Sequence, residues 1–440
     1  MSSLFNTSLR RRKLLAALGS SALAPLLPSS IWASSSHTNH PLSTEDEAFL
    51  DDLEKRACLF FWEQASPKTG QVLDRARNDL APGARDPRKM ASIAATGFGL
   101  TALCIADRRK YLPHEQIVKR VATTLDWHLN HFHHEHGFYY HFTDIETGVP
   151  FSGSEVSSID TALLLCGVLT ARAYFKDAKI HALATQIYER VDWPWMLNGD
   201  KTFSMGWHPG QGFLDARWVH YCELMMIYLL AIGSPSHPVP PGVWDAFTRP
   251  TIEYAGLKFI SGNDPIFTHQ YSQAWFDFRG KHDKYADYFE NSVIATRAHK
   301  AFCLSMPKWY NEDYWGISAS DYQGGYTAWG GPPLQGPVDG TVVPNAAAGS
   351  LAFMPVDCLH VLRVLQTKWG KQAWGRYGFV DAFHTAANWY DPDVLGIDQG
   401  ISLIMAENLR TSFVWETFMR NPEAVDAMNK AGFMSGSLHG

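Results

Sequence analysis

The chain has 440 residues, of which 46% are hydrophobic, 13% aromatic and 19% charged, and its formal net charge is −6. A chain this long and apolar can bury a large core, which excludes general disorder. The acidic balance disfavours a nucleic acid or an anionic membrane as partner, because phosphate binding requires a basic surface. The 16 Trp, 17 Tyr and 25 Phe residues suit a core and also suit stacking on sugar rings, which is a hint toward carbohydrate.

The N-terminal residues have the pattern of an export signal. Arg10-Arg11-Arg12-Lys13 precedes an apolar run from Leu14 to Leu27, and small residues follow up to Ala33. The paired arginines resemble a twin-arginine signal, although Sec export also fits. The apolar run is too short for a stable membrane anchor, and no later stretch is apolar enough to span a membrane.

We therefore expect a twin-arginine-like signal peptide at 1–33, a flexible linker at 34–44 and a single globular domain at 45–440. The mature protein is expected in the periplasm, as a monomer without a stable membrane anchor.

No metal or cofactor site is predicted. The six cysteines occur singly in apolar segments without a C-x-x-C pair, so a zinc site is not expected; their even number permits disulfides without specifying any. Four histidines crowd together at 131, 133, 134 and 136. They fit a polar surface turn better than a metal site, and we expect activity to survive chelators.

Apolar periodicity predicts about twelve helices. The expected ranges are 44–64, 91–108, 113–132, 156–175, 178–191, 217–232, 240–257, 289–305, 355–369, 373–386, 401–408 and 412–420. Strand patterns are few: 137–142, which could pair with 149–152, and 203–208. Helices in this number, joined by connections rich in glycine and aromatic residues, indicate an all-α fold of helix pairs in an α/α toroid. A large irregular helical array is the alternative.

Glu223 is the most informative single acid. From Arg217 to Ile232 nearly every position is apolar, which is typical of a helix buried on most sides. An ionised carboxylate there would be costly unless it is paired, hydrogen-bonded or placed at a cavity. Glu223 is therefore either a satisfied structural acid or an acid that faces a pocket.

Further acids lie in unusual connections. Asp144 turns the chain after an aromatic segment, and Glu155 precedes a helix that carries Asp160. For Glu155, capping of the helix and the helix macrodipole explain the acid as well as a role in catalysis does. Asp160 is expected further inside an apolar helix, which makes that explanation weaker. Asp398 lies between glycines before an apolar helix, either as an N-cap or as a carboxylate at the mouth of a barrel.

Two loop regions combine polar and aromatic residues, as binding sites often do. WFDFRG at 275–280 and DYFENS at 287–292 mix acids, amides and aromatic rings. The 34 residues from Gly316 to Gly349 show little helical pattern, and a connection of that length is generally functional or disordered. Its aromatic residues favour order, and we expect it to form one wall of a cleft.

Together these segments resemble the bacterial glycoamylase-like domain, the group that includes the endo-β-1,2-glucanases of glycoside hydrolase family 144. The matching pieces are SSIDTALL at 157–164, YCELMMIYLLAIGSPSHP at 221–238, WFDFRG at 275–280, DYFENSVIATRAHKAFC at 287–303, GISASD at 316–321, GGYTAWGGPP at 324–333, DGTVVPNAAAGSLAFMP at 339–355, WGRYGFVDAF at 374–383 and LGIDQG at 395–400. They follow one another along nearly all of the expected mature chain.

The resemblance implies an (α/α)6 barrel with short β-hairpins and long loops at the cleft, no required metal or cofactor, and inverting hydrolysis of β-1,2-glucan or its oligosaccharides. Glu223 would protonate the glycosidic oxygen, directly or through a substrate hydroxyl, and burial in apolar surroundings would keep its carboxyl protonated. Asp398 is the first choice for the base, and Asp144, Glu155 and Asp160 are its rivals. The expected substrate contacts are Asp277, Arg279, Glu290, Asn291, Ser318, Asp321, Tyr326 and Trp329.

Four alternatives stay open on the sequence. The same scaffold could be exo-acting or transglycosylating, or it could act on another β-glucan, because fold does not fix substrate. The chain could also be a non-catalytic glucan-binding protein. The presence of Glu223, Asp160 and Asp398 together in one chain disfavours the hypothesis of a non-catalytic binding protein.

Overall fold

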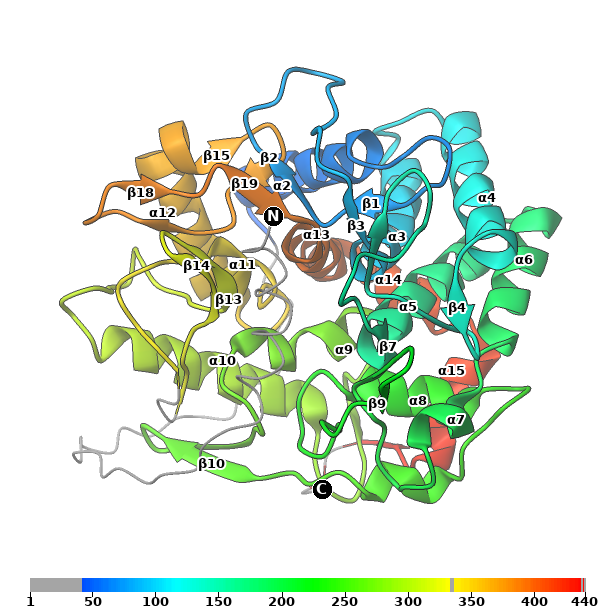
Figure 1. Ribbon diagram of the computed structural model, residues 1–440. Helices are drawn as coiled ribbons and strands as arrows, with labels where there is room; N and C mark the ends of the chain where they lie inside the picture. Colours follow the sequence, from blue (N-terminus) through cyan, green and yellow to red (C-terminus); the bar gives the residue numbers. More distant parts are fainter. Residues whose placement is uncertain (1–41, 333–335, 437, 439–440) are drawn as a thin grey trace.

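The computed structural model describes residues 42–332, 336–436 and 438. The predicted signal peptide at 1–33 and most of the predicted linker at 34–44 lie outside these residues. Helices carry most of the described architecture (Figure 1). Their bounds are α2 Thr44–Glu63, α3 Ile93–Arg109, α4 His114–Asn130, α5 Ser158–Tyr174, α6 Ala178–Glu189, α7 Trp193–Leu197, α8 Met225–Gly233, α9 Tyr271–Trp275, α10 Tyr288–Leu304, α11 Pro344–Ala348, α12 Pro355–Ala373, α13 Gly396–Thr411, α14 Phe413–Phe418 and α15 Pro422–Lys430.

Six of the described helices, α3, α5, α8, α9, α11 and α13, form a closed inner ring. Helix α3 packs against α5 and α13, α5 against α8, and α11 against α13. The hydroxyl of Ser272 on α9 donates to the carbonyl of Glu223 at the start of α8 (2.7 Å). The amide of Gln270, just before α9, donates to the carbonyl of Ala346 on α11 (3.0 Å). The predominantly helical fold predicted from the sequence is therefore confirmed.

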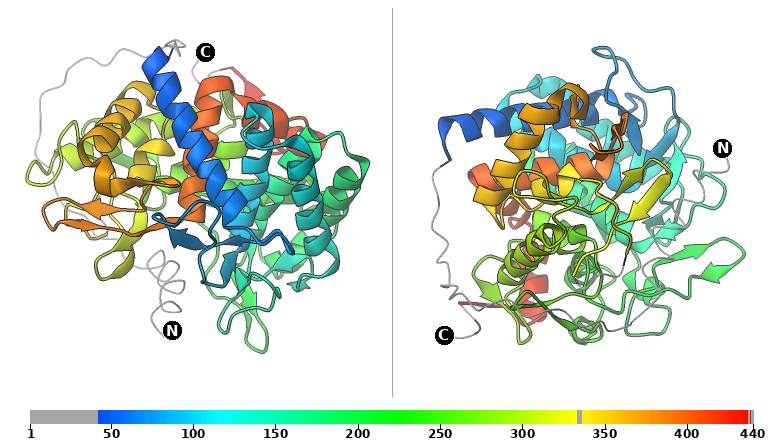
Figure 2. Two further views of the ribbon diagram at one scale, coloured as in Figure 1. Left: turned by 90° about the horizontal axis from the view of Figure 1, so that it is seen from above. Right: turned by 90° about the vertical axis from the view of Figure 1, so that its left-hand side faces the viewer.

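A second set of helices covers the ring. Helix α2 packs against α3 and α13, α4 against α3 and α6, α6 against α5, α12 against α11, and α15 against α8. Figure 2 (left) shows α2 and α13 side by side, with short strands gathered at one end of the helices. The inner helices are apolar on nearly all sides because they are covered both by one another and by this outer layer.

Helices α3 and α5 approach each other closely through two glycines. A Cβ on Gly97 would lie 2.3 Å from the carbonyl oxygen of Leu163, and a Cβ on Gly167 would lie 2.0 Å from the carbonyl oxygen of Gly97. Any side chain at either position would force the two backbones apart. This contact sets the distance between α3 and α5.

The described strands are short and belong to two- or three-stranded sheets. Their bounds are β1 Val72–Leu73, β2 Arg75–Arg77, β3 Met90–Ser92, β4 His134–Glu135, β5 Phe138–Tyr139, β6 Phe142–Asp144, β7 Val156–Ser157, β8 Gly206–His208, β9 Gly212–Phe213, β10 Thr251–Tyr254, β11 Leu257–Ile260, β12 Lys281–His282, β13 Ala319–Tyr322, β14 Gly325–Ala328, β15 Trp374–Gly375, β16 Gly378–Phe379, β17 Phe383–His384, β18 Trp389–Tyr390, β19 Asp393–Leu395 and β20 Met434–Ser435. Pairing of β2 with β19 places Arg75 opposite Leu395, beside the start of α13.

Three predicted helices differ from the structure. The segment 217–220 is extended and 221–224 forms a turn, because the backbone here bonds to other loops: Trp218 N donates to Phe203 O and Tyr221 N to Thr248 O. Helix α8 therefore begins only at Met225.

The predicted helix at 240–257 is wrong. The structure has a 3-10 turn at Pro241–Asp245 followed by the hairpin β10–β11. Its turn residues Ala255 and Gly256 both have positive φ, which suits a tight hairpin turn.

The predicted helix at 373–386 is also wrong, because this segment forms β15, β16 and β17. The long connection at 316–349 contains the hairpin β13–β14 and the short helix α11. Helices α7, α9, α11 and α15 were not predicted.

Candidate active site

A cavity opens at the N-terminal ends of the inner helices. It has roughly 780 Å³ of space not filled by atoms, part of it open to solvent. Its lining combines three acids and a histidine with aromatic and apolar side chains: His141, Ile159, Asp160, Leu163, Trp218, Glu223, Pro265, Phe267, Tyr271, Ala319, Tyr326, Ala328, Ile397 and Asp398. The structure thus brings Glu223, Asp160 and Asp398 together from three different elements. Hairpin β13–β14 forms one wall, as expected for the 316–349 segment.

Asp160 is held at the first turn of α5, not deeper in the helix as the sequence suggested. Ser157 is the N-cap, and its hydroxyl accepts a hydrogen bond from the backbone N–H of Asp160 (3.2 Å). The same hydroxyl donates to the Asp160 carboxylate. An acid at this position is stabilised by the helix macrodipole. Asp160 therefore lies at the cavity with a fixed orientation.

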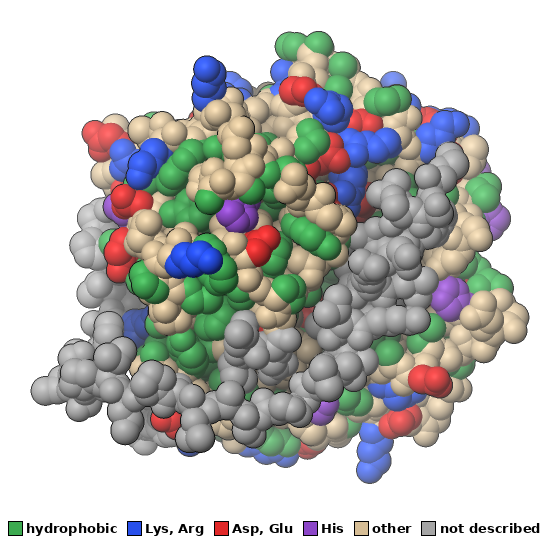
Figure 3. Space-filling model, turned by 60° about the vertical axis from the view of Figure 1, so that its left-hand side comes forward, with side chains coloured by type: hydrophobic (Ala, Val, Ile, Leu, Met, Phe, Trp, Pro, Cys, Tyr) green, Lys and Arg blue, Asp and Glu red, His purple; other side chains and the backbone are tan. Residues whose placement is uncertain are grey.

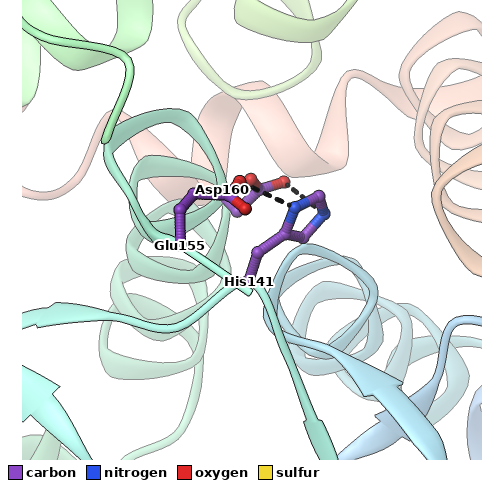
Figure 4. Close-up of side chains that lie close together, drawn as sticks. All are labelled: His141, Glu155 and Asp160. Carbon is purple, nitrogen blue, oxygen red and sulfur yellow. Dashed lines mark hydrogen bonds and ion pairs between the residues drawn. The ribbon is translucent and has the colours of Figure 1, made fainter. Parts of the chain in front are cut away.

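His141 lies between Asp160 and Glu155 (Figure 4). Its Nδ1 is 3.1 Å from Glu155 Oε1, and its Nε2 is 3.4 Å from Asp160 Oδ1. The ring stacks on Phe142 with a centroid distance of 3.7 Å. Each ring nitrogen of His141 therefore faces a carboxylate oxygen. The three side chains form one buried unit in the cavity wall.

Glu223 precedes α8 and is 5% exposed. Its backbone carbonyl is fixed by Ser272, whose hydroxyl also accepts from Met226 N (3.1 Å). Burial raises the pKa of the adjacent Cys222 thiol, and the neighbouring Glu223 carboxyl raises it further. Glu223 lines the cavity, as do Trp218 and Tyr271.

Asp398 is in the first turn of α13 and is 5% exposed; Leu395, not Asp398, is the N-cap. The charge of Asp398 acts on Asp381, a buried acid in the connection between β16 and β17. Burial raises the pKa of Asp381 well above its ordinary value, and the charge of Asp398 raises it further.

Two more acids, Asp321 and Asp391, stand close to Asp381. Burial and the charge of Asp321 raise the pKa of Asp391 to about 8. Arg75 is the cation of this group: it forms ion pairs with Asp74 and Asp321. The charge on Asp381 acts on it as well. Four acids, Asp74, Asp321, Asp381 and Asp391, therefore lie close to one another with Arg75 as their cation.

Two side-chain groups in the described residues hold three possible donor atoms within 4.8 Å of one another. The first is His141 with Glu155 and Asp160, where each ring nitrogen already faces a carboxylate. The second surrounds Asp381, where Arg75 already supplies a positive charge. Neither geometry calls for a metal ion, and we assign none; the metal-independence expected from the sequence stays a prediction.

Several residues expected at the site do not line the cavity. Asp144 caps its own turn: its Oδ1 accepts from the N–H groups of Glu146 (3.0 Å) and Thr147 (2.9 Å). Burial alone would raise the pKa of Asp144, but these hydrogen bonds hold it below the ordinary value. It is therefore a turn-forming acid. Glu155 contacts the cavity only through His141.

Among the expected substrate contacts, only Tyr326 lines the cavity. Asn291 pins β11 through hydrogen bonds with both backbone groups of Ile260. Glu290 lies beside it in the first turn of α10. Ser318 and Trp329 are buried at the base of hairpin β13–β14, and Asp321 pairs with Arg75.

Asp277 and Arg279 lie after the C-terminal end of α9, away from the cavity. They pair with each other through two hydrogen bonds of 2.9 Å, and Arg279 stacks on Trp415.

The sequence reasoning missed His141, Trp218, Phe267, Tyr271 and Asp381. A polar residue in an aromatic run was the available signal for His141, in FYYHF at 138–142. Asp381 offered a similar signal, as an acid in the apolar segment GFVDAF at 378–383. The aromatic residues could not be singled out because most aromatic side chains in this chain are core.

The surface shows no dominance of one charge on the face drawn in Figure 3, where Lys and Arg lie interspersed with Asp and Glu. Within the described part of the chain, no helix is both long and apolar enough to cross a membrane.

Comparison with known proteins matches this chain to a family. Residues 215–422 match the family model Glycoamylase, described as "Putative glucoamylase". This range contains Glu223 and Asp398. An exo β-1,2-glucooligosaccharide sophorohydrolase (non-reducing end) from Parabacteroides distasonis is 29% identical over 90% of this chain. The chain spans 59% of the length of that relative.

Solved structures agree with this match over almost the whole fold. The endo-β-1,2-glucanase from Chitinophaga pinensis, in complex with sophorotriose and glucose, is 27% identical with a TM-score of 0.82, and the alignment covers 90% of this chain and 99% of the other. A "putative glucoamylase" from Bacteroides caccae is 30% identical with a TM-score of 0.82, covering 89% of this chain and all of the other. The chain therefore belongs to the glycoamylase-like family.

Proposed function

We propose that this protein is a glycoside hydrolase that cleaves β-1,2-glucan or its oligosaccharides with inversion at the anomeric carbon. The observation that carries the proposal is the cavity at the N-terminal ends of the inner helices, which is lined both by Glu223, just before α8, and by Asp398 in the first turn of α13. The relatives support the substrate class, because their names specify β-1,2-linked glucans.

In this proposal Glu223 is the general acid. It gives its proton to the oxygen of the glycosidic bond, directly or through a substrate hydroxyl, while the bond to the anomeric carbon breaks. Asp398 is the general base: it takes a proton from a water that attacks the anomeric carbon from the opposite face. Both carboxyls return to their starting states by proton exchange with solvent, and the product has the inverted configuration.

The remaining polar groups of the cavity would hold the sugar. Asp160, oriented by Ser157 and His141, offers a fixed hydrogen-bond acceptor to sugar hydroxyls. Trp218 and Tyr326 offer ring faces for the C–H faces of glucose, and the indole N–H of Trp218 is already bonded to Ser158 (2.8 Å), which fixes the ring. Fixed groups of this kind lose little entropy on binding.

Incubation of the purified protein with linear and cyclic β-1,2-glucan, followed by chromatography of the products, tests the proposal. Release of sophorose alone would indicate exo action, and a ladder of oligosaccharides would indicate endo action. Newly formed longer oligosaccharides would indicate transglycosylation. The absence of any product, with retained glucan binding, would support a glucan-binding protein and contradict hydrolysis. Proton NMR of the first product gives the anomeric configuration and so tests inversion.

We also propose that residues 1–33 direct export to the periplasm by the twin-arginine route, that 34–44 act as a linker, and that 45–440 form the single catalytic domain. The basic residues followed by an apolar run support this proposal. Replacing Arg11-Arg12 by Lys-Lys should retain the precursor in the cytoplasm, as measured by cell fractionation. Unchanged export of this variant would contradict the twin-arginine route.

A further inference from the structure

Glu155 is buried behind the cavity wall without lining the cavity itself. Its side chain is 6% exposed, and its Oε1 lies 3.1 Å from Nδ1 of His141, which does line the cavity. A buried acid is costly unless it is hydrogen-bonded, and the imidazole is such a partner. Glu155 therefore contacts the cavity wall through His141.

The backbone fixes how Glu155 and His141 face each other. The N–H of His141 donates to the carbonyl of Glu155 (2.9 Å), and the N–H of Phe142 donates to the hydroxyl of Ser154 (2.9 Å). On its other side, the carbonyl of His141 accepts from the N–H of Ile93 at the start of α3 (3.2 Å). The two segments thus lie side by side against an inner helix, which sets the distance between the two side chains.

Packing confines both side chains as well. A Cβ on Gly206 of β8 would lie 3.1 Å from Cγ of Glu155 and 2.6 Å from the carbonyl oxygen of Val156, so the glycine leaves room for the carboxylate. The ring of His141 stacks on Phe142 with a centroid distance of 3.7 Å. The plane of the imidazole is therefore set by stacking, and the hydrogen bond with Glu155 sets its direction within that plane.

The far edge of the imidazole meets an acid of the cavity. Nε2 of His141 lies 3.4 Å from Oδ1 of Asp160, and the hydroxyl of Ser157 donates to Oδ2 of the same carboxylate. Each oxygen of Asp160 is thus contacted by a different side chain (Figure 4). The carboxylate cannot turn without losing one of these contacts, and the contact on Oδ1 depends on where Glu155 holds the ring.

We propose that Glu155 is a positioning residue for substrate binding: it accepts a hydrogen bond from the Nδ1–H of His141 and so holds the ring against Asp160, whose carboxylate binds sugar hydroxyls. This inference rests on the proposed function, in which Asp160 accepts from the hydroxyls of the gluco-oligosaccharide. Glu155 touches neither the sugar nor the reacting atoms, and it transfers no proton. A misoriented acceptor weakens binding before and during bond cleavage alike, so the loss should raise KM more than it lowers kcat.

Two substitutions of Glu155 test the hydrogen bond. Glu155→Leu removes the acceptor, and we expect the affinity for sophorotriose, measured by titration calorimetry, to fall by about tenfold with a matching rise in KM. Glu155→Gln keeps an oxygen that can accept from Nδ1–H, so its affinity should stay within about threefold of the parent. An unchanged affinity in Glu155→Leu, or an equal loss in both variants, would overturn the proposal.

A double-mutant cycle separates positioning from a general structural role. Asp160→Ala removes the group that Glu155 is proposed to position. In that background Glu155→Leu should cause no further loss of affinity, because residues that act through one another are not additive. The same tenfold loss in both backgrounds would show that Glu155 supports only the fold, and would contradict the proposal.

Nuclear magnetic resonance of the parent protein with ¹⁵N-labelled histidine needs neither turnover nor a folded Glu155→Leu variant. The His141 signal is assigned by its absence in His141→Phe. The proposal requires a hydrogen on Nδ1 that is protected from exchange, and an Nδ1 without hydrogen would overturn it. If the cycle and the spectrum agree with the proposal but the protein hydrolyses no glucan, the positioning role holds and the proposed function fails instead.

Discussion

Carboxylates are buried at both ends of the inner helices, but their surroundings differ between the two ends. At the C-terminal end, Glu54 and Glu407 are each 0% exposed. Arg410 donates to Glu54 (2.5 Å), and Arg109 donates to Glu407 (2.8 Å). At the N-terminal end, Glu223, Asp160 and Asp398 face the cavity.

The difference shows that burial of an acid does not by itself mark a site. Burial raises the pKa of Glu54 well above its ordinary value, and the charge of Glu407 adds to this although Arg410 and Arg109 oppose it. Asp381 at the other end has a pKa raised in the same direction. What distinguishes the N-terminal end is a cavity that a substrate can enter and that Glu223, Asp160 and Asp398 line.

The largest effect is expected for Glu223→Gln. The amide keeps the shape of the side chain but cannot deliver a proton, so turnover should fall by about 10² to 10⁴ while oligosaccharide binding survives. Turnover, melting temperature and affinity are measured on one preparation. Asp144→Asn is the matched control, because that acid caps a turn outside the cavity and its replacement should leave turnover unchanged. Near-parental hydrolysis by Glu223→Gln would remove Glu223 as the acid.

Glu407→Gln tests the opposite end. The change removes the nearer carboxylate partner of the partly buried Arg109 (2.8 Å) and leaves only Glu54 at 3.5 Å, which should reduce the free energy of unfolding by about 3 kcal/mol. Turnover per folded molecule should stay near the parental value, since Glu407 does not reach the cavity. Chemical denaturation gives the free energy of unfolding, and the rate divided by the folded fraction gives the turnover per folded molecule. A loss of turnover without a loss of stability would show that the two ends are functionally coupled.

A third prediction concerns pH. The pKa of Asp391 is about 8 in the folded protein, whereas an unfolded Asp has a pKa of about 3.9. The folded state binds this proton more tightly, so the associated stability is complete below pH of about 4 and is lost as pH rises toward 8. Asp391→Asn should lack this dependence and melt about 2 °C or more above the parent at alkaline pH.

The melting temperatures of parent and Asp391→Asn are compared across this pH range. The amide still accepts the hydrogen bond that Asp391 receives from the N–H of Asp393 (3.0 Å), so the comparison isolates the charge. Parallel curves for the two proteins would show that Asp391 does not retain the proton.

The smallest effect is expected for Asp277→Asn. The carboxylate pairs with Arg279 near the C-terminal end of α9, and burial would raise its pKa, but the hydrogen bonds from Arg279 lower it. Loss of this partly exposed pair should reduce stability by about 1 kcal/mol or less. KM for β-1,2-gluco-oligosaccharides should not change. A clear rise in KM would restore the sequence-based prediction that Asp277 binds substrate.

The local pattern of the chain was sufficient for the all-α architecture and for three acids of the cavity. Apolar periodicity identified the long helices α3, α4, α5, α10 and α12, because a helix covered by neighbours must carry apolar residues at helical spacing. Glu223, Asp160 and Asp398 stood out for the same reason: an acid in or beside such a segment needs a partner or a cavity.

Tertiary structure decided the rest. Whether a polar residue faces the cavity depends on which end of an inner helix it adjoins, and Asp277 adjoins the opposite end of α9 from Tyr271. His141 and Asp381 join the site only through contacts with residues that lie 14 or more positions away, such as Glu155 and Asp321. Glu223 lies outside α8 because its segment bonds to distant loops. Periodicity reports burial along one element, whereas these positions follow from the packing of several elements around one cavity.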